Sequence, residues 1–182
     1  MSSRSDGGDF LLEDDRVLVD ALLGLPHKII KNQHVDGLAH LVMHEISKPE
    51  RFGLQKSAFL VDNPDFDCLK GIAGYSHDSH AHLDDVWQNP DSFLTMLGGA
   101  TFNDHIKGFE SKSLKRNNRD MRVPDVANEV SEMIGMKNPS VIFWEMKHDN
   151  HGLFIFEPPK NACIWRHALL SNVVAFLSLC AI

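Results

Sequence analysis

The stretch VIFWEMKHDNHGLFIF, residues 141–156, carries the clearest fold signal in this chain. Apolar runs at 141–146 and 153–156 are separated by His, Asp, Asn and Gly residues that favour tight turns. Two short apolar runs joined by such residues predict a β-hairpin. Pro158-Pro159 follows after one residue and is expected to end the second strand.

A second pair of apolar runs precedes this hairpin in the sequence. Residues 57–61 and 69–75 flank the turn-rich segment 62–65, and they predict two further strands. Residues 162–165 predict one more short strand. Together these segments favour a mainly antiparallel sheet.

Helical periodicity surrounds the strands on both sides. Leucines at positions 11, 18, 22 and 25 predict an N-terminal helix, which Gly24 and Pro26 are expected to end. A second helix is expected over 33–47, and the two helices would form an antiparallel pair.

The rest of the chain predicts shorter helices and one apolar terminal helix. Helices are expected over 92–97, over 103–114, from Pro124 to Gly135, and in the terminal run 168–182. The order of elements predicts an α+β fold: residues 1–9 form a flexible lead-in, and 10–182 form a single domain with helices packed on the sheet.

Composition narrows the classes of function. The formal net charge of −7 argues against a protein whose main partner is nucleic acid. Three widely spaced cysteines indicate reduced thiols in the cytoplasm. The apolar run 168–182 is shorter than the roughly 18 to 20 residues of a membrane span. We therefore expect a cytoplasmic protein with no membrane partner.

The chain has 11 histidines, and the densest group is His77-Asp78-Ser79-His80-Ala81-His82. Neutral imidazole is a ligand for transition metals. In extended backbone, His80 and His82 would point to the same side and could chelate one ion, and His77 could join them if the chain bends. The alternative is a solvated polar loop. The expected cofactor is a divalent transition metal, Zn or Fe.

A second histidine pair lies on the helix expected over 33–47. Asp36, His40 and His44 follow one another at intervals of four and so form one stripe. This stripe lies opposite the helix's own apolar face, so an exposed polar face is the favoured interpretation. His40 and His44 become metal ligands if the loop at 77–82 folds over them.

Two histidines also flank the turn of the 141–156 hairpin. His148 and His151 could reach one ligand, but Asp149 and Asn150 between them are residues that tight turns tolerate. Turn chemistry explains this group more simply than a binding site does.

A different pattern appears where the first strand of this hairpin ends. Pro124-Asp125 and Glu145-Met146-Lys147 resemble the Pro-Asp…(Asp/Glu)-x-Lys pattern of the restriction-endonuclease-like nucleases. That resemblance implies that Asp125 and Glu145 would hold Mg²⁺ while Lys147 orients the attacking water. The sequence departs from the family because Pro124-Asp125 is typical of a helix start, where the family has a strand.

The sequence leaves two main hypotheses open. One is a metal-dependent hydrolase acting on a small-molecule substrate, with Asp78, Asp84 or Asp85 as ligand or general base. The other is a non-catalytic sensor or interaction module, in which the apolar sheet and the terminal helix form a surface for a homodimer or another partner.

Overall fold

The computed structural model describes residues 16, 18–80, 85–97, 99–114, 123–159 and 164–180. For residues 79, 80 and 164–166 only the backbone is described. All structural statements below refer to these residues.

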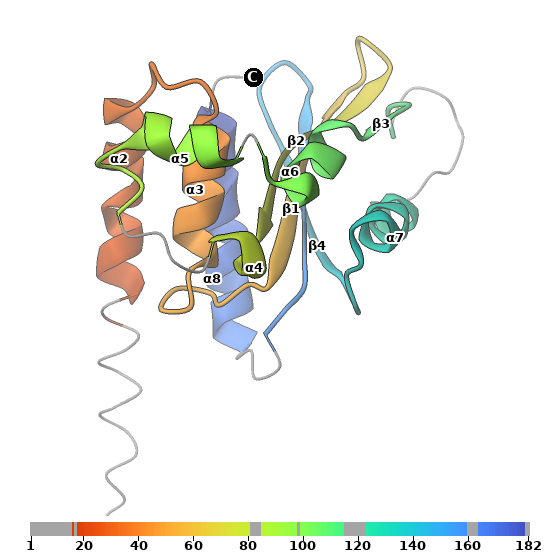
Figure 1. Ribbon diagram of the computed structural model, residues 1–182. Helices are drawn as coiled ribbons and strands as arrows, with labels where there is room; N and C mark the ends of the chain where they lie inside the picture. Colours follow the sequence, from red (N-terminus) through yellow and green to blue (C-terminus); the bar gives the residue numbers. More distant parts are fainter. Residues whose placement is uncertain are drawn as a thin grey trace, which may run out of the picture.

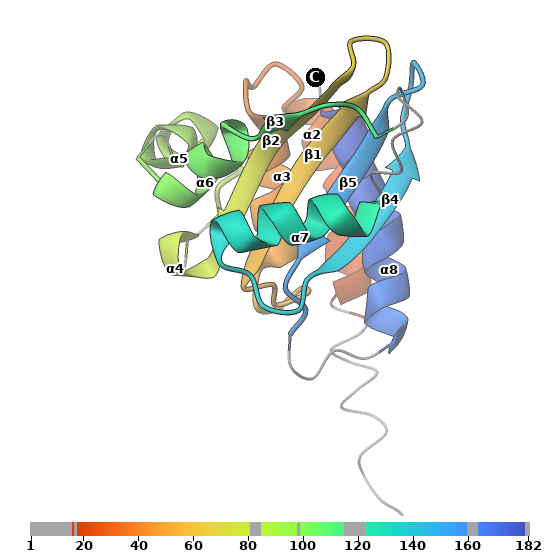
Figure 2. The same ribbon diagram turned by 90° about the vertical axis from the view of Figure 1, so that its right-hand side faces the viewer.

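Within the described ranges, five antiparallel strands form one sheet in the order β3-β2-β1-β5-β4. The strands are listed here with their bounds: β1 Lys56–Asn63, β2 Cys68–Ser76, β3 Glu110–Ser111, β4 Ser140–Glu145 and β5 His151–Phe156. β1 lies at the centre between β2 and β5 (Figure 2). Both predicted hairpins are confirmed, and β1 joins them into one sheet.

Alternation along the strands gives the sheet two apolar faces. Phe59 and Val61 point to one core cluster, while Ala58 and Leu60 point to the other. Helices cover both faces, so the molecule has three layers (Figure 1). The α+β single-domain architecture expected from the sequence is thereby observed.

The N-terminal helix continues through Gly24, contrary to the sequence prediction. Residues 18–23 are helical, and Gly24 keeps right-handed helical angles before α2, Leu25–Lys31. Backbone hydrogen bonds from Gly24 N to Asp20 O and from Lys28 N to Gly24 O carry the helical pattern across this point. Pro26 is tolerated because it lies in the first turn of α2.

The second predicted helix is α3, Leu38–Ser47, which begins five residues later than expected. Gly37 precedes it with φ of 86°, a left-handed conformation that favours glycine. Residues 32–37 therefore form a turn between α2 and α3. The two helices lie side by side on one face of the sheet (Figure 1).

Several helices are described between the two hairpins in the chain. They are α4 His77–His80, α5 Pro90–Leu97, α6 Thr101–Lys107 and α7 Val123–Ile134. The helix predicted over 103–114 ends at Lys107, because the following residues pair with β2 as β3. α6 and α7 cover the sheet face opposite α3 (Figures 1 and 2).

The strand predicted over 162–165 is wrong from Ile164 onward. Ile164 begins α8, Ile164–Val174, which continues into the 3-10 helix η1, Ala175–Leu179. Leu170, Val173 and Leu177 are buried at helical spacing. A four-residue apolar run cannot distinguish a strand from the start of such a helix.

α6 approaches the sheet closely because β2 has glycines beneath it. A Cβ at Gly71 would overlap the backbone carbonyl of Ile106, and a Cβ at Gly74 would lie 2.8 Å from the Ile106 side chain. This contact sets the position of α6 and therefore of Asn103, which it carries. Among the described helices, none is both long enough and apolar enough to cross a bilayer.

Candidate functional site

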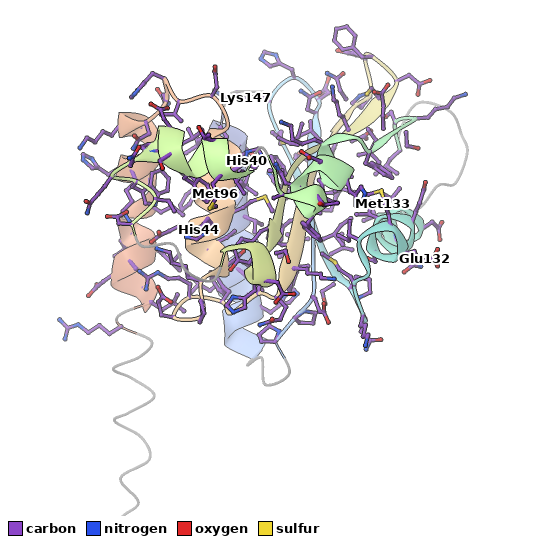
Figure 3. All side chains as sticks on the ribbon, viewed as in Figure 1. His40, His44, Met96, Glu132, Met133 and Lys147 are labelled. Carbon is purple, nitrogen blue, oxygen red and sulfur yellow. The ribbon has the colours of Figure 1, made fainter. Side chains whose placement is uncertain are left out.

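The histidines of α3 are buried, which corrects the expectation of an exposed polar face. Every residue of α3 is buried, and His44 is only 2% exposed. The side of α3 turned away from the sheet is covered by α2 and α5 (Figure 1). Both histidines therefore lie in the interior of the molecule (Figure 3).

His40 and Asn103 connect three elements by hydrogen bonds. Its Nε2 lies 2.9 Å from Oδ1 of Asn103 on α6, and its Nδ1 lies 3.2 Å from the carbonyl oxygen of Gly37. The same Asn103 oxygen accepts a hydrogen bond from the backbone N–H of Gly74 at 3.0 Å. A neutral imidazole can donate to only one of these two oxygens, and the shorter contact joins α3 to α6. Asn103 in turn joins α6 to β2.

His44 lies among aromatic side chains. Its ring centroid is 5.2 Å from that of Phe93 on α5 and 6.0 Å from that of Tyr75 on β2. These contacts make His44 part of the core between α3, α5 and the sheet.

The histidine segment at 77–82 begins as a helical turn over His77–His80. The backbone of α4 places positions 77 and 80 one turn apart. His77 is half-buried, and its backbone N–H donates a hydrogen bond to the Gln55 carbonyl at 2.8 Å. Asp78 is exposed. The His80 side chain, His82 and Asp84 lie outside the described residues.

The described part of the chain contains no group of three His, Cys, Asp or Glu side chains arranged to hold a metal ion. Asp85 is exposed, and its carboxylate accepts hydrogen bonds from the N–H of Trp87 at 3.1 Å and from Gln88 Nε2 at 3.3 Å. Asp85 therefore orders the turn that leads into α5.

The residues of the nuclease-like pattern lie on different kinds of element. Asp125 is exposed in the first turn of α7, and Glu145 is the exposed last residue of β4. Lys147 is exposed in the turn that follows (Figure 3). The helix start expected at Pro124 is confirmed, so the departure from the family pattern remains.

The two histidines at the hairpin turn lie in different environments. His148 and Asp149 have positive φ angles of 59° and 56°, which confirms that turn chemistry explains this segment. His151 differs, because it is the first residue of β5 and is buried.

His151 belongs to a polar row that the sequence analysis missed. In the strand register it pairs with Asp62 of β1 on one side and with Glu145 of β4 on the other. Asp62 is fully buried, and its Oδ1 accepts a hydrogen bond from Leu114 N at 3.1 Å. The alternation of side chains along the predicted strands could have placed His151 inside the sheet. The turn residues at 148–151 instead favoured placing His151 in the turn.

A buried carboxylate forms the most connected polar cluster in the described structure. Glu45 on α3 has a side chain that is 3% exposed. Its oxygens lie 3.2 Å from Lys48 Nζ, 3.4 Å from Lys28 Nζ and 3.6 Å from the Arg51 guanidinium. Trp87 Nε1 donates to Oε2 of Glu45 at 3.1 Å.

The charge state of Glu45 follows from these contacts. Burial by itself raises the pKa of Glu45, but attraction to Lys48 and Lys28 and hydrogen bonds from Lys48 and Trp87 outweigh it. The net result is a pKa below the ordinary value of 4.5. Glu45 is therefore an anion at neutral pH, and it fixes the surrounding cations and the Trp87 indole.

Trp87 also borders a hollow of about 760 Å³ between the α2–α3 turn and the start of α5. Lys28 Nζ lies 5.6 Å from the centre of the indole, which adds a cation–π contact to the Glu45 hydrogen bond. The hollow is lined by both polar and apolar residues. They are Lys31, Asn32, His34, Val35, Asp36, Trp87, Gln88, Pro90, Asp91, Leu94 and Thr95.

Sequence patterns give little warning of this hollow, because its walls come from segments that are 50 or more residues apart. Glu45 stands out in the sequence only as an acid after the second histidine of a His-x-x-x-His spacing. No protein-family model, curated protein or solved structure was found to be similar to this chain.

Proposed function

We propose that this chain is a non-catalytic sensor module that binds a small molecule in the hollow between α5 and the α2–α3 turn. The observation that carries this proposal is the size of the hollow together with its fixed aromatic wall. A volume of several hundred Å³ is typical of small-molecule sites.

The wall is ordered before any ligand binds. The indole Nε1 of Trp87 donates a hydrogen bond to the buried carboxylate of Glu45, and Lys28 Nζ lies over the indole ring. Asp85 fixes the backbone of the same residue. Because the indole is already immobilised, a ligand that contacts it loses less conformational entropy of the site on binding.

The lining residues favour a small zwitterionic ligand. Lys31 and His34 offer cationic or donor groups, while Asp36 and Asp91 offer carboxylates. Val35, Leu94 and the Trp87 ring supply apolar surface between them. Free amino acids combine these features and are the simplest probes of the site.

The position of the hollow suits a sensor. Lys31 is the last residue of α2, and Lys28 of the same helix contacts both Glu45 and Trp87. A ligand that binds Lys31 contacts α2 itself, and a ligand that binds Trp87 contacts the side chain on which Lys28 of α2 rests. Movement of α2 relative to α3 is the conformational change that binding would bias.

The test is a thermal-melting screen of the purified chain against the free amino acids, followed by calorimetry. We expect at least one of them to raise the Tm, because a ligand that binds only the folded state stabilises it by mass action. Asp36→Lys places a cation in the hollow and should abolish the shift. Glu132→Lys, an exposed change on α7 (Figure 3), is the matched control and should keep it. A screen in which no amino acid shifts the Tm would contradict the proposal.

A second candidate function is transition-metal binding at α4, with metal-dependent hydrolysis as its chemistry. The helical turn of α4 favours this hypothesis because it sets positions 77 and 80 one turn apart, a spacing used by metal-binding helices. Asp78 lies between them and would serve as a further ligand or as the general base.

Elemental analysis of untagged protein tests this second candidate. We expect stoichiometric Zn or Fe, lost on combining His77→Ala with His80→Ala and retained in His105→Ala, which changes an exposed histidine of α6. Chelator should lower the Tm of the wild type and leave the double variant unchanged. Protein that carries no metal and ignores chelator would rule out this candidate.

A further inference from the structure

The outer face of the N-terminal helix carries a stripe of exposed apolar side chains. Val19, Leu23 and Ile30 are 41%, 73% and 62% exposed, and their spacing of four and seven residues places them on one side of the helix. The opposite side carries the leucines and isoleucine that pack on the core. We call the residues Val19, Leu23 and Ile30 the outer stripe.

Such a stripe is unusual on a helix at the surface of a single domain. An amphipathic helix ordinarily presents polar residues to water on the side opposite the core. Here the helix runs from residue 18 to 31 along the outside of the molecule (Figure 1). An apolar row in this position is typical of a surface that meets an interaction partner.

The charges beside the outer stripe identify the partner. Asp20 and Lys31 lie on the same edge of the stripe, one near each end, at about 60° and 80° from Leu23 when each residue turns 100°. In an antiparallel pair of identical helices, a two-fold axis brings this edge of one helix against the same edge of the other. Residues whose numbers add to about 51 then face each other, so Asp20 faces Lys31 in both directions.

We propose that two copies of this chain associate through the outer stripe as an antiparallel, two-fold symmetric dimer. Leu23 of each copy packs between His27 and Ile30 of the other, and two Asp20–Lys31 ion pairs flank this apolar centre. A parallel two-fold pairing would turn this edge of one helix toward the opposite edge of the other, so the Asp20–Lys31 pairs would not form. The contact is isologous, as in most homodimers.

The outer stripe is a different surface from the sheet and terminal helix that the sequence suggested for a dimer. Helices cover most of both sheet faces. The outer stripe is independent of the hollow, so dimerisation and ligand binding can fail separately. Lys31 touches both features, and for this reason the first variants change Leu23 and Ile30.

Light scattering coupled to size-exclusion chromatography, over a hundredfold range of concentration, tests the dimer with the full chain. We expect the wild type to be a dimer at the highest concentrations. Leu23→Glu and Ile30→Glu should each weaken association by about tenfold or more. Phe66→Glu changes an exposed apolar residue in the β1–β2 turn and should leave association unchanged. Circular dichroism and Tm show whether each variant is folded.

A charge exchange then tests the antiparallel arrangement. Asp20→Lys and Lys31→Asp should each weaken the dimer, and the double variant should restore it, because opposite charges face each other again. A wild type that stays monomeric at every concentration would overturn the proposal, as expected if residues 1–15 or an unrelated protein cover the stripe. A dimer that survives Leu23→Glu would also overturn it, and a double variant weaker than either single change would overturn the antiparallel register.

Discussion

At the scale of single residues, the buried carboxylate of Glu45 gives a direct prediction of stability. Its carboxylate is the common partner of three cations and of the Trp87 indole. Glu45→Gln leaves those cations without their shared anion, and we expect a loss of about 1–3 kcal/mol in the free energy of unfolding. Glu132→Gln, an exposed change, should cost less than about 0.5 kcal/mol. Urea denaturation at pH 7 measures both.

The same residue gives the protein an acid-sensitive stability. Because the pKa of Glu45 in the folded state lies below its ordinary value of 4.5, the contribution is complete above that pH. It is lost as the pH falls below 4.5 through the folded pKa. The difference in stability between wild type and Glu45→Gln should therefore shrink below pH 4.5, and a constant difference would contradict this account.

The histidines show what can and cannot be predicted about individual side chains. The i, i+4 spacing of His40 and His44 correctly places them on one stripe of a helix. It does not reveal their burial, because α5 and α6 reach α3 only through the tertiary fold. A hydrophobic pattern describes one helix at a time, and a helix that is covered on all sides can hold polar residues that are satisfied by distant partners.

At the scale of elements, the contact between α6 and β2 depends on a missing side chain. A Cβ at Gly71 would overlap the carbonyl of Ile106, which is backbone and cannot move without shifting α6. We expect Gly71→Ala to destabilise the protein by about 1–3 kcal/mol or more. Gly99→Ala is the matched control, since a Cβ there would meet only Met96 O at 4.0 Å. Thermal unfolding compares the two variants, and we expect a lower Tm for Gly71→Ala than for Gly99→Ala. Equal Tm values would contradict the packing argument.

The strands and the longer helices could be predicted because their signals are local. Both hairpins follow from apolar runs joined by turn residues, and α7 begins near Pro124 and ends before Gly135 as expected. The errors fall where tertiary contacts decide. Gly24 and Pro26 do not end the helix, since Leu25 and Ile29 continue its buried stripe. Residues 110–111 form a strand because β2 offers them an edge.

At the scale of the whole molecule, the antiparallel character of the sheet could be predicted, but its strand order and the candidate sites could not. The hairpins imply neighbouring strands, and covering helices follow from the amphipathic segments around them. The hollow beside Trp87 and the pairing of Asp62 with His151 join residues far apart in sequence. Only the assembled fold brings these groups together, so no spacing rule identifies them.

Two groups buried by the fold make the stability of the molecule sensitive to alkali. Burial, with a contribution from Glu50, raises the pKa of Tyr75 to about 12, and burial raises that of Cys180 to about 12. Because these folded-state pKa values lie above the ordinary values of 10.0 and 9.0, the contribution of the two groups to stability is complete below pH 9 and is lost as the pH rises toward 12. For Tyr75 the loss should reach about 1.4 kcal/mol by pH 11. Tyr75→Phe removes the ionisable group, so its unfolding free energy, measured in urea from pH 8 to pH 11, should fall less steeply than that of the wild type. Parallel curves would show that Tyr75 ionises equally well in the folded and unfolded chains, and would contradict its burial against His44.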